Sequence, residues 1–452
     1  MRWLVDNVDI VLELTRTHLY LSLVPLLIGL VIAVPLGAAV RTVSWLRRLT
    51  LVVASVAFTI LSLALFVTIP LIVGLRVLDP LNVVIALTVY STALLVRAVP
   101  EALDSVSPAV VDASTAMGFG RIRRAATVEL PLALPVLVAN IRVVAVTNIS
   151  MVSVGSVIGI GGLGQLFTQG YQRDYPDQIL AGIIAIVVLA LVFRDAVPDR
   201  ERPDPVDSCR IDHSPSERCP RMSIFSDAVA YILDGANWSG GTGIATRLGE
   251  HAYYSLLAVL FSAVVAVPLG LIIGHLRRGE VALVGLVNSL RSLPTLGVLT
   301  FLVLLLGLGL VPPLVALVLL GIPPILAGTY AGVANVDATV VDAARAMGMT
   351  ERQVLFRVEI PNSLPLLLGG IRNATLQVIA TATVAAFVNL GGFGRYIFDG
   401  LALYSYDRVV VGAILVAVLA LVVDGLLALA VWASTPGTGR LRRTPRVEKS
   451  SV

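Results

Sequence analysis

The chain has 452 residues, of which 57% are hydrophobic and only 14% are charged, and its net charge is +4. A soluble chain of this length would divide into domains whose surfaces carry far more charge, so the composition argues against a soluble protein. The only lysine is Lys449. The chain therefore lacks the Walker A lysine that holds nucleotide phosphates, and any ATP hydrolysis must be performed by another chain.

Apolar segments of about 20 residues recur in chain order, and this length and composition are typical of membrane-spanning helices. Lipid offers no hydrogen-bond partner to open backbone, so each segment is expected to be a helix. We predict an all-α, polytopic membrane protein with about five spanning helices in each half. The segments are 19–40, 49–74, 80–99, 134–158 and 179–193, then 252–274, 281–308, 311–334, 363–388 and 409–434.

The two halves repeat one another. Pro35-Leu36-Gly37 recurs 233 positions later as Pro268-Leu269-Gly270. From residue 112 onward the same kind of match holds with a shift of 230 positions. We divide the chain into a first repeat (1–193), a polar Pro-rich linker (194–221), a second repeat (222–434) and a basic tail (435–452).

Arginines set the expected orientation. They gather in the loops after the first and third apolar segments of each half, and the positive-inside rule places such loops in the cytoplasm. Each half should therefore begin outside and, after five crossings, end inside. The arginines are Arg41, Arg47, Arg48, Arg121, Arg123 and Arg124 in the first half, and Arg277, Arg278, Arg345, Arg352 and Arg357 in the second.

The linker conflicts with this orientation. Residues 194–221 contain seven acids, six arginines and five prolines, a composition that predicts disorder. No apolar segment between 194 and 250 can return the chain to the outside. Three interpretations follow: the short helix 179–193 does not cross; the second half is translated separately from Met222; or a reading-frame slip joined two adjacent genes. We favour the last two together. Cys209, His213 and Cys219 lie in this linker without a fourth ligand, so no metal site is predicted.

The loop between the third and fourth segments carries one motif twice. It reads acidic-Ala-small-x-x-x-Gly, nine residues, then aliphatic-x-aliphatic-Pro, with identical spacing in both halves. Its glycines, Gly118 and Gly348, permit a sharp left-handed break after a short helix. A plain cytoplasmic helical hairpin could explain one copy, but two copies at matched spacing argue against that explanation.

This motif resembles the EAA loop of ABC importer permeases, with Asp in place of Glu and Val in place of Ile. The resemblance implies an ABC type I importer permease fold in which these loops form coupling helices that dock on a separate ATPase. The implied coupling residues are Asp112, Ala113, Gly118, Glu129 and Pro131 in the first half, and Asp342, Ala343, Gly348, Glu359 and Pro361 in the second.

Within ABC permeases the chain is most similar to the osmoprotectant group, which imports glycine betaine, choline, carnitine or proline. The resemblance implies two ATPase copies that use ATP and Mg²⁺, an extracytoplasmic substrate-binding protein, and a place in the cytoplasmic membrane of a prokaryote. It implies no cofactor in this chain, no catalytic residues and no nucleic-acid partner. The stretches that carry it include Val34-Pro35-Leu36-Gly37, Ser292-Leu293-Pro294-Thr295-Leu296, Gly161-Gly162-Leu163-Gly164, Gly391-Gly392-Phe393-Gly394 and Ala236-Asn237-Trp238-Ser239.

Several other residues have two interpretations. Pro294 should kink the second helix of the second half, whereas the first half has Leu61 there and should be straighter. The glycines of the two Gly-rich runs could shape an external mouth or form plain turns: Gly161, Gly162, Gly164, Gly391, Gly392 and Gly394. Arg142 and Arg372 could line the path, but we favour side chains that extend toward the cytoplasmic interface. Polar residues of the fourth helices could face the pore, but bonding to backbone is the commoner role; they are Asn148, Ser150, Ser153, Gln377, Thr381 and Thr383.

Three alternatives stay open. The chain could be an ABC permease for an amino acid or another small solute. It could be a secondary transporter or channel with two repeats, which predicts ionisable residues inside the membrane, where the sequence offers only Asp424 near a helix end. It could also be a scaffold or a non-functional fused relic of a permease.

Overall fold

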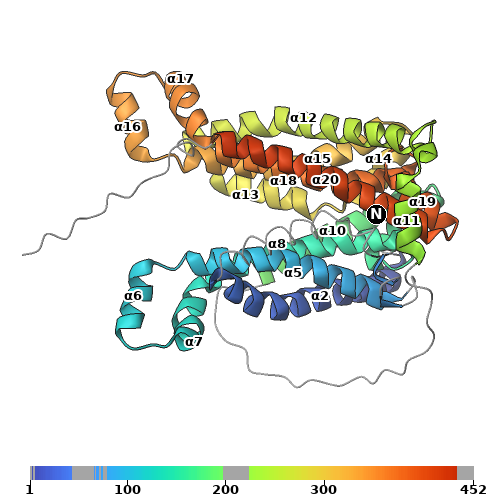
Figure 1. The fold of residues 1–452 in the computed structure, drawn as a ribbon, viewed down its shortest axis with the longest axis horizontal. Coiled ribbons are helices and arrows are strands. Elements are labelled where there is room, and N and C mark those ends of the chain that lie inside the picture. Colours follow the sequence, from blue (N-terminus) through green and yellow to red (C-terminus); the bar gives the residue numbers. More distant parts are fainter. Residues whose placement is uncertain are drawn as a thin grey trace, which may run out of the picture.

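The computed structural model describes residues 3, 6–42, 66, 68–70, 73–74, 79–196 and 223–434. Within these ranges every regular element is a helix, which confirms the all-α fold class. Figure 1 shows two groups of long helices, one from each half of the chain, lying side by side. Among the described residues, 8 helices are long and apolar enough to cross a membrane, or 9 if one bent pair is a single span.

The first half forms a helical bundle with a small projecting unit. Its third predicted segment, 80–99, begins at the first residue of an observed helix, Pro80. Its fourth, 134–158, begins four residues after the start of another, Leu130. The second predicted segment, 49–74, lies almost entirely outside the described residues, and so does Leu61. The observed helices are α2 (Val8–Thr42), α5 (Pro80–Asp104), α6 (Pro108–Ala116), α7 (Arg121–Arg124), α8 (Leu130–Val152), α9 (Gln165–Gln172) and α10 (Pro176–Ala196).

The second half repeats this order, and it also has α11 before the first long helix and α13 and α14 in the place of the first half's second segment, which lies almost entirely outside the described residues. The sequence did not predict the short helices α9, α11 and α19. The helices are α11 (Ser223–Leu233), α12 (Ile244–Leu276), α13 (Glu280–Ser292), α14 (Thr295–Leu306), α15 (Val311–Ala334), α16 (Ala338–Ala346), α17 (Glu351–Val354), α18 (Ile360–Ala382), α19 (Gly394–Ala402) and α20 (Tyr406–Ser434).

The predicted kink at Pro294 is a complete break. Helix α13 ends at Ser292, α14 begins at Thr295, and the axes of the two pieces differ by 78°. Pro294 itself is extended, with φ −71° and ψ 113°, and it occupies the N-cap of α14. Proline has no N–H and disfavours a helical conformation in the residue before it, so the chain stops one helix and starts another here. The predicted segment 281–308 is therefore two half-helices.

Glycine sets the distance between the first and third helices of each half. A Cβ added at Gly270 on α12 would lie 2.7 Å from the Cβ of Thr329 on α15, and one at Gly37 would lie 2.7 Å from the Cβ of Val99. Neither position has room for a side chain. Small residues at such crossings let two backbones pack closely in a membrane, where lipid removes most of the hydrophobic drive for helix association. The repeated Pro-Leu-Gly motif is thus a packing motif.

The last helix of the first half is longer than the sequence predicted. Helix α10 has 21 residues because it begins at Pro176 rather than at residue 179 and ends at Ala196 rather than at residue 193. Its segment Pro176–Phe193 is long and apolar enough to cross a membrane. Near its end, Ala190 and Leu191 border the same cavity as Ala139 and Arg142 early in α8. Helix α10 therefore ends in the half of the bundle where α8 begins.

The next described helix lies at the other end of the molecule. Ala228 and Tyr231 of α11 pack in one apolar cluster with Tyr396 of α19 and Val410 near the start of α20. Figure 1 shows α11 beside α19, far from α6 and α16. The structure therefore keeps the conflict seen in the sequence. The first repeat ends at Ala196 at one end of the bundle, and the second begins at Ser223 at the other. Residues 197–222 lie outside the described residues.

Replacing Gly270 by leucine should destabilise the protein by about 1–3 kcal/mol, because overpacking a closed helix crossing forces backbone shifts. Thermal unfolding of the detergent-solubilised chain measures this. Gly425→Leu is the matched control, since a Cβ there meets no atom within 4 Å. Equal unfolding temperatures for the two variants would contradict the packing role.

Blotting native membranes for both halves tests how the chain is made. If the second half is translated from Met222, antibodies against 222–434 should detect a product near half of the 47.7 kDa full length. Pulse labelling should show this product without a full-length precursor. A single full-length band would contradict separate synthesis.

Candidate functional site

Each half carries a short helical hairpin that projects from the same end of the bundle. In the first half α6 and α7 form it, and in the second half α16 and α17 form it. Figure 1 shows both hairpins at one end of the molecule, beyond the ends of the long helices. The repeat therefore presents two similar protrusions to the same side of the membrane.

Local sequence explains why the hairpins form. The carboxylate of Asp337 accepts a hydrogen bond of 2.8 Å from the N–H of Thr339 and caps α16. This bonding lowers the pKa of the Asp337 carboxyl. Gly118 and Gly348 follow the short helices with φ +83° and +81°, a left-handed conformation that favours glycine. A Cβ at either glycine would meet no atom within 4 Å, so the backbone conformation, and not crowding, requires glycine.

The same face of each short helix is exposed. Ser114 and its counterpart Ala344 are buried against the rest of the hairpin. Around them the exposed positions match one for one between the halves. These exposed residues are Asp112, Ala113, Ala116 and Met117 on one hairpin, and Asp342, Ala343, Ala346 and Met347 on the other. The two methionines are 70% and 76% exposed, which leaves a small-residue face with an apolar tip for a partner.

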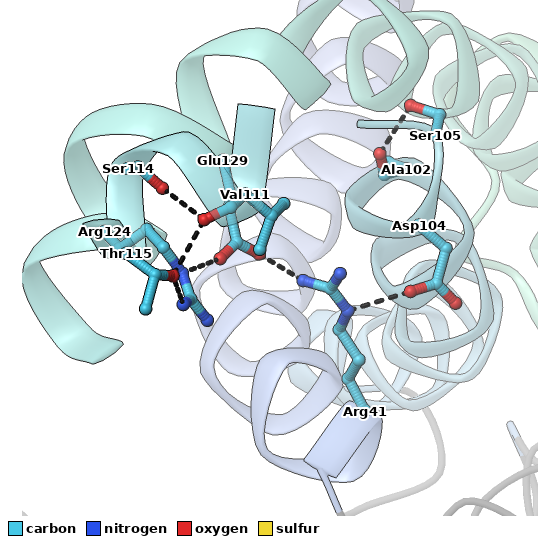
Figure 2. A network of polar contacts seen from close by, with 9 residues as sticks. All are labelled: Arg41, Ala102, Asp104, Ser105, Val111, Ser114, Thr115, Arg124 and Glu129. Carbon is cyan, nitrogen blue, oxygen red and sulfur yellow. Dashed lines mark hydrogen bonds and ion pairs between the residues drawn. The ribbon is translucent and has the colours of Figure 1, made fainter. Parts of the chain in front are cut away.

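In the first half a buried carboxylate ties the hairpin to the bundle (Figure 2). Glu129 is only 3% exposed. Arg124 donates from Nε to Glu129 Oε1 over 2.7 Å, and Arg41 at the end of α2 donates to the other oxygen. Arg41 also donates to Asp104 Oδ1 at the end of α5, over 2.8 Å. Arg124 reaches Thr115 Oγ1 on α6 as well, at 2.7 Å. One carboxylate thus links the hairpin to two membrane helices.

In the second half different residues make the equivalent connection. Glu359 is also 3% exposed. His275 at the end of α12 lies with Nδ1 2.6 Å from Glu359 Oε2 and Nε2 3.3 Å from Glu351 Oε2. Glu351 accepts two hydrogen bonds from Arg345, at 3.0 and 3.1 Å. Arg345 also lies 3.5 Å from Asp342 on the exposed face of α16. A chain of hydrogen bonds and ion pairs therefore runs from the bundle to the exposed face.

The backbone aims both glutamates inward. Each lies at the end of a π-helical turn, Ala125–Glu129 in one half and Leu355–Glu359 in the other. Such turns insert one residue into a helix and are frequent at functional sites. Pro131 and Pro361 follow in the first turn of α8 and α18, where the missing N–H is tolerated.

Comparison with known protein families identifies this architecture. The family model described as binding-protein-dependent transport system inner membrane component matches twice, at residues 26–194 and 266–431. The chain belongs to this family. It is an inner-membrane permease of a binding-protein-dependent importer, and the ATPase of such an importer is a separate component.

This permease is similar, over less than half of its own length, to single-copy relatives. A glycine betaine/carnitine/choline transport system permease protein of Bacillus subtilis is 39% identical over 198 residues, which is 44% of this chain and 91% of the relative. An osmoprotectant import permease protein of Salmonella typhimurium is 35% identical over 40% of this chain and 78% of its own length. A solved inward-facing MetNI methionine ABC transporter matches 42% of this chain and 96% of its own with a TM-score of 0.39 and 20% identity.

The sequence singled out the loop residues of the permease but missed their anchors. Arg41 entered the sequence analysis only as an orientation signal, and His275 did not enter it at all. Both lie at the end of the first long helix of their half and contact the buried glutamate. Each half has a basic residue at the end of its first long helix, an arginine in one half and a histidine in the other. This repetition is the sequence feature that could have indicated both anchors.

Arg372 has a partner that the sequence did not indicate. Its guanidinium is not free but forms two hydrogen bonds with Asp424 on α20, at 2.6 and 2.8 Å. This bidentate geometry joins α18 to α20 and neutralises the acid. The one ionisable residue that could have suggested ion coupling is therefore part of a structural pair. Arg142, the counterpart of Arg372, borders a cavity between α8, α10 and α13.

The Gly-rich runs form buried turns rather than an open mouth. Gly162 has φ +48°, and a Cβ there would lie 2.8 Å from the Cα of His18. Gly392 has φ +87° and lies against His251. The two histidines are buried and donate from Nε2 to the carbonyl oxygens of Ile149 and Ile379, over 2.8 and 2.9 Å. Gly161, Gly164 and Gly394 are equally buried, while Gly391 is half-buried. Gly162, Gly391 and Gly392 pack closely against the first helix of their half. The other three glycines pack against the turn that follows the fourth helix: Gly161, Gly164 and Gly394.

Replacing Glu129 by glutamine should loosen the first hairpin, because two arginines then lose their shared negative partner. We expect a cost of about 1–3 kcal/mol, since the arginines are partly exposed and solvent screens the pair. Faster trypsin cleavage at Arg123 and Arg124 and a lower unfolding temperature are the readouts.

Glu13→Gln is the control for the same chemical change, because Glu13 is exposed on α2. Glu359→Gln should loosen the second hairpin less, because one histidine contacts that carboxylate instead of two arginines. Unchanged cleavage in Glu129→Gln would contradict the anchoring role.

Proposed function

We propose that this chain is the complete membrane-spanning part of an ATP-driven importer for small osmoprotectants of the glycine betaine, choline, carnitine and proline type. The observation that carries the proposal is the pair of hairpins with matching exposed faces at one end of the molecule. Two such faces on one chain offer two docking sites. One fused chain would then replace the two permease subunits of an importer built from separate subunits.

The proposed partners follow from the two faces. One ATPase copy docks on Ala113 and Met117 of the first hairpin, and a second copy docks on Ala343 and Met347 of the second. The exposed acids Asp112 and Asp342 are available to basic residues of the ATPase. The two ATPases use ATP and Mg²⁺, and this chain itself contributes no catalytic group and no cofactor site. A substrate-binding protein delivers solute at the end of the molecule that carries α9 and α19.

Coupling follows from the anchored glutamates. When ATP draws the two ATPases together, it moves the two hairpins, and Glu129 and Glu359 pass the motion to the long helices. A two-state rearrangement of this kind, driven by differential binding to one state, can alternate access between the two sides. The substrate class rests on the similarity of this chain, over 44% and 40% of its length, to osmoprotectant permeases.

Uptake of labelled glycine betaine at high osmolarity tests the proposal. The host lacks its own betaine importers and carries this chain with the ATPase and binding protein encoded beside it. Gly118→Val and Gly348→Val should each lower uptake at least tenfold, because a β-branched residue at φ near +80° costs at least ~1–2 kcal/mol and distorts the docking hairpin.

Gly118→Asn and Gly348→Asn are the matched controls, because asparagine tolerates the left-handed conformation. They should retain more uptake than the valine variants. Full uptake in the double valine variant would contradict coupling through the hairpins. No uptake of betaine, choline, carnitine or proline, with the chain present in the membrane, would contradict the substrate class and leave an amino acid or an inactive fusion as the alternatives.

A further inference from the structure

A cavity of about 170 Å³ lies where the two halves meet. Its walls come from α5 and α8 of the first half and from α13, α14, α15 and α18 of the second. The lining positions are related by the repeat: Tyr90 corresponds to Leu320, and Val143 corresponds to Asn373, each 230 positions apart. A cavity lined by such twin positions lies on the pseudo-twofold axis between the halves. That is the place where a path through a two-repeat transporter must run.

The two sides of this cavity differ in chemistry. The second half contributes the polar side chains Asn373, Gln377 and Thr381. At the matching positions the first half contributes Val143, Thr147 and Met151, and its Tyr90 faces Leu320 across the repeat. The second-half wall therefore offers amide and hydroxyl groups, and the first-half wall combines an aromatic ring and a thioether with the hydroxyls of Thr147 and Ser150. A ligand with one polar anionic end and one bulky, weakly hydrated end would match this arrangement.

Arg291 adds a positive charge to the lining of this cavity. It lies in the last turn of α13, just before the Pro294 break, and it borders this cavity and a neighbouring one of about 550 Å³. Within the described part of the chain no carboxylate forms an ion pair with it, in contrast to Arg372 with Asp424. A half-buried arginine without an acid partner in a membrane protein is costly, and an anionic ligand would offset that cost.

The charge belongs to one half only. Arg291 precedes Pro294 by three residues, and the residue in that place before Leu61 is Phe58. A symmetric cavity would carry two cations and repel any cationic solute from both sides. Among the described residues that line the cavity, Arg291 is the one cation, and it gives the cavity one anion-accepting end.

The volume and the outlet of the cavity limit the ligand. A space of 170 Å³ holds about five or six water molecules at ~30 Å³ each, so it suits a solute with few heavy atoms. The cavity shares Leu94 and Asn373 with a third one of about 260 Å³. That cavity is lined by Arg97 and Glu101, one turn from Asp104 at the hairpin end of the bundle. The cavities thus continue toward the cytoplasmic side.

We infer that this cavity is an intramembrane binding site for a small zwitterion, with the carboxylate held by Arg291, Asn373 and Gln377 and the methylated ammonium packed against Tyr90 and Met151. Arginine binds carboxylates through paired N–H donors. Aromatic rings attract quaternary ammonium groups through their negative faces. The inference rests on the proposed function for its choice of ligand, and it places part of the substrate selectivity in the permease itself.

Direct binding to the detergent-solubilised full chain tests the site without the ATPase or the binding protein. Labelled glycine betaine and labelled choline are measured by equilibrium dialysis. Choline carries the same methylated ammonium but no carboxylate. Arg291→Gln should weaken betaine binding at least tenfold and leave choline binding unchanged or stronger. Arg16→Gln, at an exposed position on α2, should change neither.

Two further variants exchange a lining residue for its twin from the other half. Asn373→Val should weaken betaine binding more than choline binding, and Tyr90→Leu should weaken both. These variants keep the test decisive if Arg291→Gln fails to fold. Equal losses of betaine and choline in Arg291→Gln and Asn373→Val, or no binding of either ligand to the wild-type chain at millimolar concentration, would overturn the inference.

Uptake separates this outcome from a failure of the proposed function. Import of betaine by the wild-type system, with no loss in Arg291→Gln, would leave the function standing and overturn the site. Absence of import by the wild-type system, together with betaine binding that depends on Arg291, would contradict the importer and retain the site.

Discussion

A buried carboxylate at the start of the fourth long helix anchors each hairpin to the membrane bundle. Glu129 and Glu359 are both 3% exposed, and removing a charge from water is costly unless a cation and hydrogen bonds compensate. The compensating groups come from the end of the first long helix, Arg41 in one half and His275 in the other. The cost of leaving either glutamate unpaired therefore holds together three parts of each half: the first helix, the fourth helix and the hairpin between the third and fourth.

The two halves keep the same geometry with different chemistry. Both anchors hold a glutamate placed by a π-helical turn, yet one anchor is built from arginines and the other from a histidine inside a longer chain of charge. The central cavity shows the same divergence, because Val143 and Met151 on one side have the polar twins Asn373 and Thr381 on the other. A symmetric pair of identical subunits could not hold such differences. Two repeats with separate sequences can differ in their side chains while the close backbone contacts, such as those at Gly37 and Gly270, stay the same.

Local features of this fold could be read from the sequence, and long-range pairings could not. Apolar length predicted most helices, and the repeated spacing placed both hairpins, because those signals depend on neighbouring residues. The full break at Pro294 was underestimated as a kink. The pair between Arg372 and Asp424 spans 52 residues, and the bond between His18 and Ile149 spans 131. Nothing in local sequence indicates which of several polar residues in a membrane helix will meet across such a distance.

The same limit applied to the cavity. Polar residues of the fourth helices were visible in the sequence, but only the fold separates those that bond within the protein from those that border open space. Asn148 is fully buried between Ser22 and Ser91, and Thr383 donates to the carbonyl of Ala380. Ser150, Gln377 and Thr381 border the cavity instead. The helical period puts these groups on different faces of the helix, and the position of the second half decides which face is open.

The anchors and the cavity are connected through rigid elements. Helix α18 begins directly after Glu359 and carries Gln377 eighteen residues later, about 27 Å away at 1.5 Å per residue. Helix α5 likewise carries Tyr90 at the cavity and Asp104 at the anchor. A displacement of a hairpin must therefore move the cavity walls, because the buried glutamate fixes one end of the helix whose other end lines the cavity. The break between α13 and α14 is where the second half can absorb that movement, and Arg291 lies directly beside it. The charge that would hold the solute is thus placed at the point where the path can change shape.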